Sequence, residues 1–360
     1  MSAALPIPLP PPSGGRVDLL VVAGEHSGDE HAARMVRELR AKQPGIAVAA
    51  LGGPRLAAAG AQLLHDLTAT SVLGFGEVVK RVSFYRALIA EIVRWVGEHR
   101  PRAVCFVDSS GLNLRIAAGL FARGFSAKAG GPTKALYYIS PQVWASRAGR
   151  RFTMARHLDG LAAIFPFELK VYADTALPVE FVGHPFLALD YTAPVRFDPA
   201  GPVLLLPGSR QSAVARIFPV LLESFRFGGT GREAVVLYPS DEVRAVLRAA
   251  NPPANVRLVR TGEPATGAAV LTSSGTMSMH CALAGIPGAI TYRTDPLTYW
   301  LGRMLVRVDQ LGIANLLLGE PMYPEFIQVA AKPAALAREL RACLADPARR
   351  ARTAAQAARL

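Results

Sequence analysis

The sequence predicts an α/β protein made of two doubly wound, Rossmann-like halves. Short apolar runs alternate with helical patterns along the whole chain. Several of the runs end in a polar, glycine-bearing turn that leads into a helix, which is the βα unit of a parallel sheet. At 360 residues the chain is long enough for two domains that each have a core of their own.

Residues 1–15 are expected to form a disordered leader. They are rich in proline and carry neither the basic start nor the sustained apolar core of a signal peptide. The first Rossmann-like domain is therefore placed at residues 16–195.

The first βα unit begins with Leu19–Ala23, an apolar run. The turn Gly24-Glu25-His26-Ser27-Gly28-Asp29 and a helical pattern through Arg40 follow it. Ile46–Leu51 is the second predicted strand and ends in a further glycine-rich turn. Open α/β sheets bind ligands at the C-terminal ends of their strands, so both turns are candidates for a site.

The stretch Gly76–Glu98 has apolar residues at helical spacing with basic residues among them. One interpretation is an amphipathic helix that faces the core of the first domain. The other is a basic apolar surface that dips into a bilayer or holds acyl chains.

Val104–Val107 is another predicted buried strand, and Asp108 follows it directly. A carboxylate at the end of a strand, beside a glycine-bearing turn, is well placed to act as a general base. An aspartate in this position is also common as an Asx turn or a helix cap, so both roles stay open.

Three more strands complete the first half, at Ala135–Ile139, Leu161–Ile164 and Val179–Val182. Basic residues follow the first of them, at Arg147, Arg150 and Arg151. The last ends in Gly183-His184-Pro185. A histidine in such a turn is usually structural, although His184 comes where a cleft between the domains is expected.

Pro194–Pro202 is predicted to be the linker, followed by a second domain at 203–345 and a C-terminal tail at 346–360. A helix is expected from Ala213 through Phe225, broken at Pro219, and another at Pro333–Leu344 with its proline in the first turn. The predicted strands are Val203–Leu206, Ala234–Tyr238, Val256–Val259, Ala269–Thr272 and Ala289–Tyr292.

The second domain opens with a candidate anion site. Its first strand ends in Pro207-Gly208, and Ser209-Arg210 come at the start of a helical pattern. A helix N-terminus with free N–H groups and a guanidinium suits a phosphate. An ordinary βα turn with a solvated arginine is the alternative. Ser274-Gly275-Thr276 opens a helix that is a second candidate of this kind.

The composition limits the classes of partner that the chain is expected to bind. The net charge of +13 favours anionic ligands or an anionic membrane surface, while dispersed basic residues argue against nucleic acid. The mean hydropathy is +0.25, yet no stretch is a good membrane span. Cys105, Cys281 and Cys343 form no CxxC pattern, which fits a reducing compartment.

The sequence also lacks the signatures of several enzyme classes. There is no GxGxxG after the first strand, no GxxxxGK[ST], no GxSxG and no clustered metal-ligand set. No cofactor and no metal are expected. Two doubly wound halves with anion sites therefore favour an enzyme for a phosphorylated or nucleotide-linked ligand, and a nucleotide-sugar transferase is the natural class. The spacing of these motifs does not by itself single out the nucleotide-sugar transferases among such enzymes.

An ordered series of motifs resembles the lipid-A-disaccharide synthase family, glycosyltransferases of the GT-B architecture. The series runs in family order from about Val17 to Gln328 and covers both halves. Its members are Gly24-Glu25-His26-Ser27-Gly28-Asp29, Gly53-Pro54-Arg55, Gly74 with Glu77-Val78, Asp108 with Asn113-Leu114, Tyr138-Ile139-Ser140-Pro141, Val143-Trp144-Ala145, Phe165-Pro166-Phe167-Glu168, Phe181-Val182-Gly183-His184-Pro185, Leu206-Pro207-Gly208-Ser209-Arg210, Ser274-Gly275-Thr276, Tyr292-Arg293 and Asn315-Leu316-Leu317.

The resemblance implies an inverting transfer between two acylated sugars. The donor is UDP-2,3-diacylglucosamine, the acceptor is 2,3-diacylglucosamine 1-phosphate, and the products are UDP and the β-1′,6-linked disaccharide of lipid A. It also implies an enzyme without a metal in the nucleotide site. The enzyme would be peripheral on the cytoplasmic face of the inner membrane, and a homodimer is known in the family.

The same resemblance assigns roles to residues, with the two halves facing a cleft. Asp108 would be the base for the acceptor hydroxyl, and Arg210 would hold the donor phosphate. The expected UDP-sugar site comprises Gly208, Ser209, Arg210, Ser274, Gly275, Thr276, His280 and Asn315. The expected cleft and acceptor residues are Glu25, Ser27, Gly28, Asp29, Asn113, Trp144 and His184.

At three positions the sequence differs from the family pattern in a way that bears on the expected activity. Gly111 stands where a second carboxylate is usual, and Ala213 stands where a glutamate is usual. His280 replaces a glutamate that is a plausible ribose ligand. Two alternatives therefore stay open: another UDP-sugar transferase or epimerase on the same fold, and a non-catalytic lipid-binding paralogue.

Overall fold

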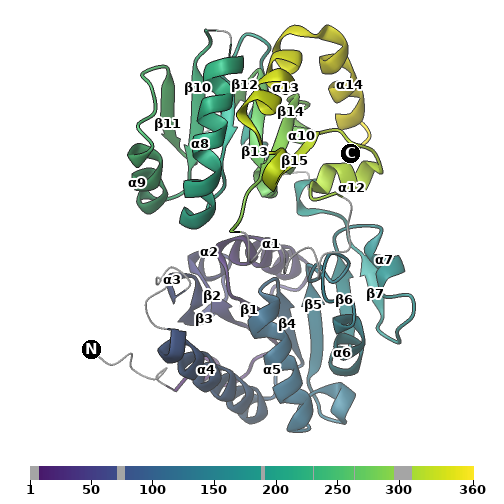
Figure 1. Ribbon diagram of the computed structural model, residues 1–360. Coiled ribbons are helices and arrows are strands. Elements are labelled where there is room, and N and C mark those ends of the chain that lie inside the picture. Colours follow the sequence, from purple (N-terminus) through teal and green to yellow (C-terminus); the bar gives the residue numbers. More distant parts are fainter. Residues whose placement is uncertain (1–7, 71–77, 188–190, 230, 263, 296–309) are drawn as a thin grey trace. The chain divides into compact units, whose positions relative to one another are not determined.

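The computed structural model describes residues 8–70, 78–187, 191–229, 231–262, 264–295 and 310–360. The chain forms two compact units, Met1–Leu189 and Asp190–Leu360. Each unit is built on a parallel sheet with helices on its faces (Figure 1). The α/β architecture with two Rossmann-like sheets is thus confirmed.

The first unit contains a seven-stranded parallel sheet in the order β3-β2-β1-β4-β5-β6-β7. β1 pairs in register with both β2 and β4, from Leu19 opposite Val48 and Ala103. The strands are β1 (Leu19–Ala23), β2 (Val48–Gly52), β3 (Gln62–Asp66), β4 (Ala103–Val107), β5 (Lys134–Tyr138), β6 (Gly160–Ala163) and β7 (Val179–Phe181).

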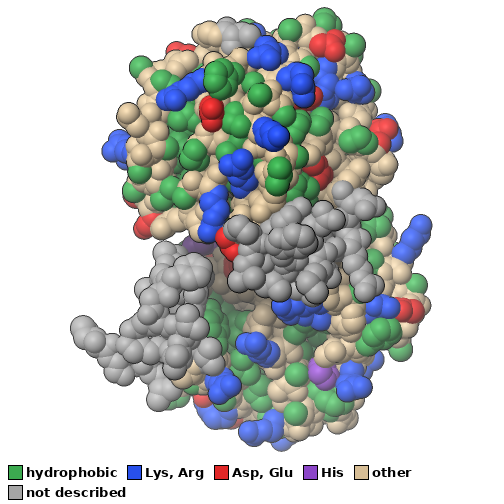
Figure 2. Space-filling model, in the orientation of Figure 1, with side chains coloured by type: hydrophobic (Ala, Val, Ile, Leu, Met, Phe, Trp, Pro, Cys, Tyr) green, Lys and Arg blue, Asp and Glu red, His purple; other side chains and the backbone are tan. Residues whose placement is uncertain are grey.

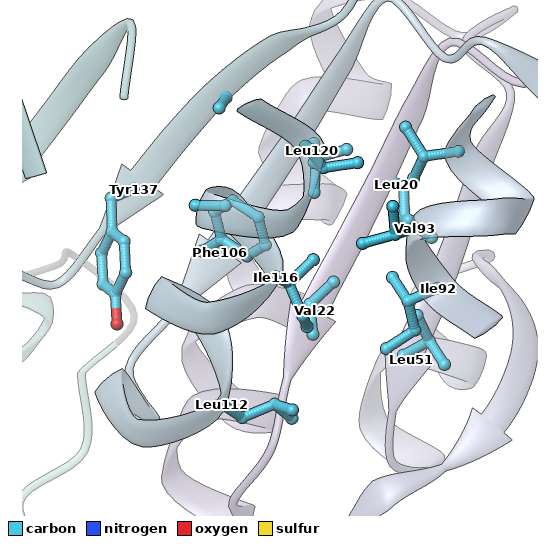
Figure 3. Close-up of a cluster of buried hydrophobic side chains, with 14 of the residues drawn as sticks. Leu20, Val22, Leu51, Ile92, Val93, Phe106, Leu112, Ile116, Leu120 and Tyr137 are labelled. Carbon is cyan, nitrogen blue, oxygen red and sulfur yellow. The ribbon is translucent and has the colours of Figure 1, made fainter. Parts of the chain in front are cut away.

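Helices cover both faces of this sheet because successive strand residues point to opposite sides. Leu19 and Val21 pack with α1 and α2, while Leu20 and Val22 pack with α4 and α5. Figure 3 shows side chains of α4 and α5 directed at β1. The helices are α1 (His26–Lys42), α2 (Pro54–Ala58), α3 (Leu67–Thr70), α4 (Val78–His99), α5 (Ser110–Ala122), α6 (Arg150–His157) and α7 (Glu168–Val171), with 3-10 turns at Ala127–Ala129 and Pro185–Leu187.

The expectation of a disordered leader is wrong for residues 8–15. Leu9 is buried in the core of the first unit, and its N–H donates to Glu91 Oε1 at 2.7 Å. The indole of Trp95 donates to the carbonyl of Pro10 at 2.9 Å. These proline-rich residues therefore pack against α4 through apolar contact and backbone hydrogen bonds. Residues 1–7 lie outside the described residues.

Helix α4 is largely a core helix. Leu88, Ile92, Trp95 and Val96 are fully buried, which supports the amphipathic interpretation for this part of the stretch. Tyr85 is half-buried against the same core. The start of the predicted stretch, including Gly76 and the side chain of Val82, lies outside what the structure describes, as do Gly74 and Glu77.

The second unit repeats the plan with a six-stranded sheet in the order β11-β10-β9-β13-β14-β15. Its larger core lies between this sheet and α8, α9 and α13. The strands are β9 (Val203–Leu206), β10 (Ala234–Tyr238), β11 (Val256–Arg260), β13 (Ala269–Ser273), β14 (Gly288–Tyr292) and β15 (Glu325–Ile327), and the helices are α8 (Gln211–Gly228), α9 (Asp241–Ala249), α10 (Thr276–Leu283), α12 (Ile313–Leu318), α13 (Pro333–Ala345) and α14 (Pro347–Ala357), with a 3-10 turn at Gln328–Ala330.

Two expectations about the ends of this unit need correction. The proposed linker at 194–202 contains strand β8 (Val195–Phe197), which pairs with β12 (Ala265–Gly267) and so belongs to the second unit. The tail at 346–360 forms helix α14. The buried Arg349 fastens this helix, because its guanidinium donates to the carbonyls of Gly288 and Met322 at 3.0 Å.

Pro219 does not break helix α8, which continues from Gln211 to Gly228. Pro219 is exposed, while Ile217, Phe218 and Leu221 are buried beside it. Packing of this apolar face holds the turn together despite the lost hydrogen bond.

Other features of the molecule bear on the predicted partners. The three cysteines, Cys105, Cys281 and Cys343, are free and buried. Among the residues that the structure describes, no helix is long and apolar enough to cross a membrane. Lys and Arg side chains are spread over the face shown in Figure 2, between hydrophobic and uncharged ones.

Candidate functional site

The first candidate site lies where the strand order of the first sheet reverses. β1 and β4 are neighbours there, and Ala23 and Val107 pair at their C-terminal ends. The loops that follow these strands begin side by side. A Cβ on Gly24 would lie 2.5 Å from Ser109 Oγ, so a larger residue there would require the Ser109 side chain to shift. Open α/β sheets bind ligands at such a switch point.

Asp108 is held at this point by an unusual backbone. Asp108 and Ser109 both adopt left-handed conformations, with φ of 51° and 43°, which non-glycine residues rarely do. The carbonyl of Asp108 accepts hydrogen bonds from Asn113 Nδ2 at 2.8 Å and from the hydroxyl of Tyr137. These two buried donors fix the loop, and the carboxyl group stays half-exposed at the strand end.

A pocket of about 410 Å³ opens beside Asp108. One part of its lining is apolar and comes from Leu67, Phe84, Tyr85, Ile89 and Leu112. The other part is polar and comes from Glu25, Asp108, Ser109, Ser110 and Arg115, with Gly24 and Gly111 completing the wall. This lining can take a ligand that has both an apolar part and a polar or anionic part.

Helix α1 supplies the groups nearest to the carboxylate. The hydroxyl of Ser27 donates to Asp108 Oδ2 at 3.4 Å, a long hydrogen bond. A Cβ on Gly28 would lie 3.6 Å from the Cβ of Asp108, so the first turn of α1 rests against Asp108. Burial lowers the pKa of His31, one turn further along, and the negative charges of Glu30 and Asp108 oppose that shift.

Of the seven expected cleft residues, Glu25 lines this pocket, Ser27 and Gly28 lie against Asp108, and the other four make other contacts. Asp29 is buried and accepts the N–H groups of Gly53, Arg55 and Leu56, so its carboxylate caps α2. Asn113 is buried and acts through the backbone of Asp108. Trp144 and His184 belong to an aromatic cluster, in which Trp144 meets Phe167 edge-on and His184 meets Phe165 and Phe186.

The second candidate site is the matching switch point of the second sheet. β9 and β13 are neighbours there, and Leu206 pairs with Thr272 at their ends. Gly208 has φ of 111°, and a Cβ on it would lie 3.2 Å from Ser273 Oγ. The turn that carries Ser209 and Arg210 therefore lies against the turn that carries Ser274, Gly275 and Thr276.

The groups that face solvent here suit an anion. Ser209, Arg210, Gly275 and Thr276 are exposed, and Ser274 is half-buried. Arg210 is the N-cap residue of the 18-residue helix α8. The positive end of the helix dipole and the guanidinium thus occur at the same turn, a combination that suits an anion.

His280 lies deeper than these residues. It is buried in α10, and its Nδ1 lies 2.5 Å from the hydroxyl of Tyr191. The two rings stack with centroids 5.7 Å apart and planes within 5°. One partner of His280 is thus Tyr191, at the start of the second unit, a contact that no motif in the sequence indicates.

The expectation that Asn315 binds the donor needs correction. Its Nδ2 donates to the carbonyl of Tyr323 at 2.8 Å and to Glu325 Oε1 at 2.9 Å. Its Oδ1 accepts the N–H groups of Met322 and Tyr323, both at 3.0 Å. The amide has no hydrogen-bonding capacity left for a ligand, so Asn315 holds the chain between α12 and β15.

Sequence reasoning missed several residues of the first site. Tyr137 and His31 act from a strand and a helix whose patterns showed only burial, and the left-handed backbone at Asp108 has no sequence signal. Arg115 is different. It lies one helical turn after Gly111, so the period of α5 after Asp108 was a usable signal for it.

No metal centre is found in the described part of the chain. No group of three or more His, Cys, Asp or Glu side chains lies close enough there to hold a metal ion.

The chain is similar to one curated family over almost its whole length. A family model described as lipid-A-disaccharide synthetase matches residues 19–359. Lipid-A-disaccharide synthase of Nitrosococcus oceani is 34% identical over 347 residues, which are 92% of this chain and 88% of the relative. That of Anaeromyxobacter dehalogenans strain 2CP-1 is 37% identical over 350 residues, 92% and 89% of the two chains.

Solved structures share the fold at low sequence identity. The calicheamicin glycosyltransferase CalG4 has a TM-score of 0.56 and 15% identity, covering 95% of this chain and 94% of its own. Staphylococcus aureus MnaA, solved with UDP, has a TM-score of 0.61 and 10% identity, covering 95% and 91%. These likenesses place both units in the GT-B fold class.

Proposed function

Because this chain belongs to the lipid-A-disaccharide synthetase family and is a glycosyltransferase of lipid A biosynthesis, we propose that it joins two acylated sugars. The donor is UDP-2,3-diacylglucosamine and the acceptor is 2,3-diacylglucosamine 1-phosphate. The observation that carries the proposal is the pocket beside Asp108, whose lining is apolar on one part and polar on the other.

In the proposed reaction Asp108 is the general base. Its carboxylate takes the proton of the acceptor 6-hydroxyl as that oxygen attacks the anomeric carbon of the donor. A new C–O bond forms, the bond to the UDP oxygen breaks, and its electron pair leaves with UDP, so the anomeric configuration inverts. A positioned base typically contributes about 10²- to 10⁴-fold to such a step.

The second switch point is the proposed donor site. Arg210 and the first turn of α8 would hold the diphosphate, and the turn at Ser274, Gly275 and Thr276 would support it. As the sugar–phosphate bond breaks, negative charge grows on UDP, and these groups stabilise that charge. UDP-linked sugars are thus the proposed donor class. This assignment leaves out Asn315, and it gives His280 a supporting place behind the turn.

The apolar part of the first pocket is the proposed binding site for an acyl chain of the substrate. Phe84, Tyr85 and Ile89 all come from α4, and burial of apolar surface stabilises binding by about 25 cal/mol per Å². Since acylated sugars reside in a membrane, the protein would bind the cytoplasmic face of the inner membrane peripherally. The net charge of +13 supports contact with anionic lipid.

The decisive experiment incubates the purified protein with both acylated substrates and follows disaccharide and UDP by mass spectrometry. We expect both products in equal amounts, with EDTA having no effect. Substrates recovered unchanged, together with normal UDP binding, would instead support the non-catalytic paralogue. Sedimentation of the same sample tests the homodimer that the family resemblance implies.

A further inference from the structure

Three arginines lie on or just before two neighbouring helices, α5 and α6, and one of them lines the first pocket. Arg115 comes from α5 and lines the pocket itself. Helix α5 packs against α6, which begins at Arg150. Arg147 precedes α6, and its carbonyl accepts the N–H of Arg150 at 2.9 Å. The two helices therefore bring the residues to one side of the site.

The charges of Arg147 and Arg115 both act on the guanidinium of Arg150. Burial lowers the pKa of Arg150, and the positive charges of Arg147 and then Arg115 lower it further. Tyr137, whose hydroxyl bonds to the Asp108 carbonyl, acts on Arg150 in the opposite direction. Arg150 is half-buried in the first unit.

The three arginines have no acidic partner among the residues that the structure describes. None of the ion pairs or side-chain hydrogen bonds found there involves Arg115, Arg147 or Arg150. The next residue shows the contrast, because Arg151 forms a paired contact with Asp174 at 2.7 and 2.5 Å. Repulsion between like charges disfavours neighbouring guanidinium groups, and an anion from outside the chain would relieve that repulsion.

The chemistry of the cluster selects a phosphate monoester. Guanidinium groups bind phosphate oxygens in pairs, and a monoester carries close to two negative charges near neutral pH. In a hexose 1-phosphate whose 6-hydroxyl is the attacking group, the hydroxyl and the phosphate flank the ring on either side of its oxygen. A pocket whose polar part carries both Asp108 and Arg115 offers one group for the hydroxyl and one for the phosphate.

We propose that Arg115, Arg147 and Arg150 form the subsite for the acceptor's phosphate monoester, which orients the sugar so that its free hydroxyl faces Asp108. The identity of the acceptor rests on the proposed function. The subsite itself rests on the pocket and the uncompensated arginines. These three arginines would give the enzyme its preference for phosphorylated over unphosphorylated acceptors.

The first test compares two acceptors, 2,3-diacylglucosamine 1-phosphate and its dephosphorylated form. For Arg150→Gln and Arg115→Gln we expect kcat/KM for the phosphorylated acceptor to fall about ten- to a hundredfold, as for lost charge-assisted hydrogen bonds. The value for the dephosphorylated acceptor should stay within about twofold. Arg151→Gln, in the same helix but paired with Asp174, is the matched control and should change neither value.

Equal losses with both acceptors would overturn the proposal, because the arginines would then support the fold and not the phosphate. Melting temperatures of all variants report on folding. If Arg150→Gln fails to fold, the comparison of the two acceptors is made with Arg115→Gln alone, since Arg115 is exposed.

The second test does not depend on turnover. Calorimetry with glucosamine 1-phosphate and no donor should show binding to the parent and to Arg151→Gln, and weakened binding to Arg150→Gln and Arg115→Gln. Absence of transfer by the parent with either acceptor would refute the proposed function, while this binding result still judges the subsite.

The last experiment measures binding of the variants to vesicles that contain phosphatidylglycerol. If the Arg115 and Arg150 variants lose vesicle binding but keep glucosamine 1-phosphate binding, the cluster contacts lipid head groups, and the acceptor subsite is refuted. Unchanged vesicle binding with weakened sugar phosphate binding supports it.

Discussion

The hydroxyl of Tyr137 donates a hydrogen bond to the backbone carbonyl of Asp108. The contact joins β5 to the loop after β4, and it reaches the main chain of Asp108, not its carboxyl group. Asn113 adds a second donor to the same carbonyl at 2.8 Å. The position of Asp108 is thus set by its backbone, and the carboxylate is left for chemistry.

Asp108→Asn is expected to abolish transfer and keep the fold. The amide cannot accept the proton, while the bonds to the backbone carbonyl remain, so the rate should fall by about 10²- to 10⁴-fold. Steady-state rates at saturating substrate, with circular dichroism and melting temperature beside them, check this. A rate within about tenfold of the parent contradicts the role of base.

Arg210→Ala is expected to weaken the donor site. The lost charge-assisted bond should reduce UDP affinity by about ten- to a hundredfold and slow turnover as well. Calorimetry with UDP measures the affinity. Arg216→Ala is the control, because Arg216 lies in the same helix, is exposed, and bonds only to the carbonyl of Ser212 at 3.3 Å among the described contacts. Equal UDP affinity in both variants would make Arg210 an ordinary surface residue.

Arg86→Glu tests membrane docking through α4. Arg86 is exposed on a helix whose other face is core, so the reversal should leave the melting temperature unchanged. Each basic residue near an anionic leaflet contributes about 1 kcal/mol, and reversal should therefore weaken liposome co-sedimentation by about tenfold or more. Arg37→Glu, exposed on α1, is the control for net charge. Identical co-sedimentation of the two variants would argue against a docking face on α4.

We expect His31 to contribute to the pH dependence of the free energy of unfolding. Burial lowers the pKa of His31 below its usual value of 6.5 in the folded chain. The unfolded chain therefore binds the proton first, and the free energy of unfolding should decrease as pH falls below about 6.5. Urea unfolding between about pH 5 and pH 8 measures the slope, and His31→Gln should flatten it. A slope that is unaffected by this substitution assigns the effect to other groups.

The sequence predicted the strands well because buried parallel strands are short apolar runs. Leu19–Ala23, Val203–Leu206 and Ala234–Tyr238 are strands with the predicted bounds. It missed β3, β8, β12 and β15, which lie at sheet edges or in the small two-stranded sheet and are only partly buried. Pro219 shows that tertiary packing can override a local signal.

The site was predicted in part. Asp108 and Arg210 lie at the two switch points, where the turn pattern placed them, and their chemical roles stay predictions. Asp29 and Asn315 matched family motifs, yet their side chains are fully used in holding the chain. A motif records that a residue type is needed at a position, and it does not distinguish ligand contact from support. Contacts between distant segments, such as that of Tyr191 with His280, have no local pattern at all.

The buried state of the three cysteines makes the chain suitable for selective labelling. Burial raises the pKa of Cys105 and of Cys343 to about 12, and that of Cys281 shifts in the same direction. Near neutral pH these thiols are almost wholly protonated and shielded, so maleimide dyes should leave them untouched. One new cysteine at an exposed site in each unit, for example Arg102→Cys and Glu223→Cys, then carries a dye pair without removal of any native thiol. Energy transfer between the dyes would report how the separation of the two units changes when UDP is added.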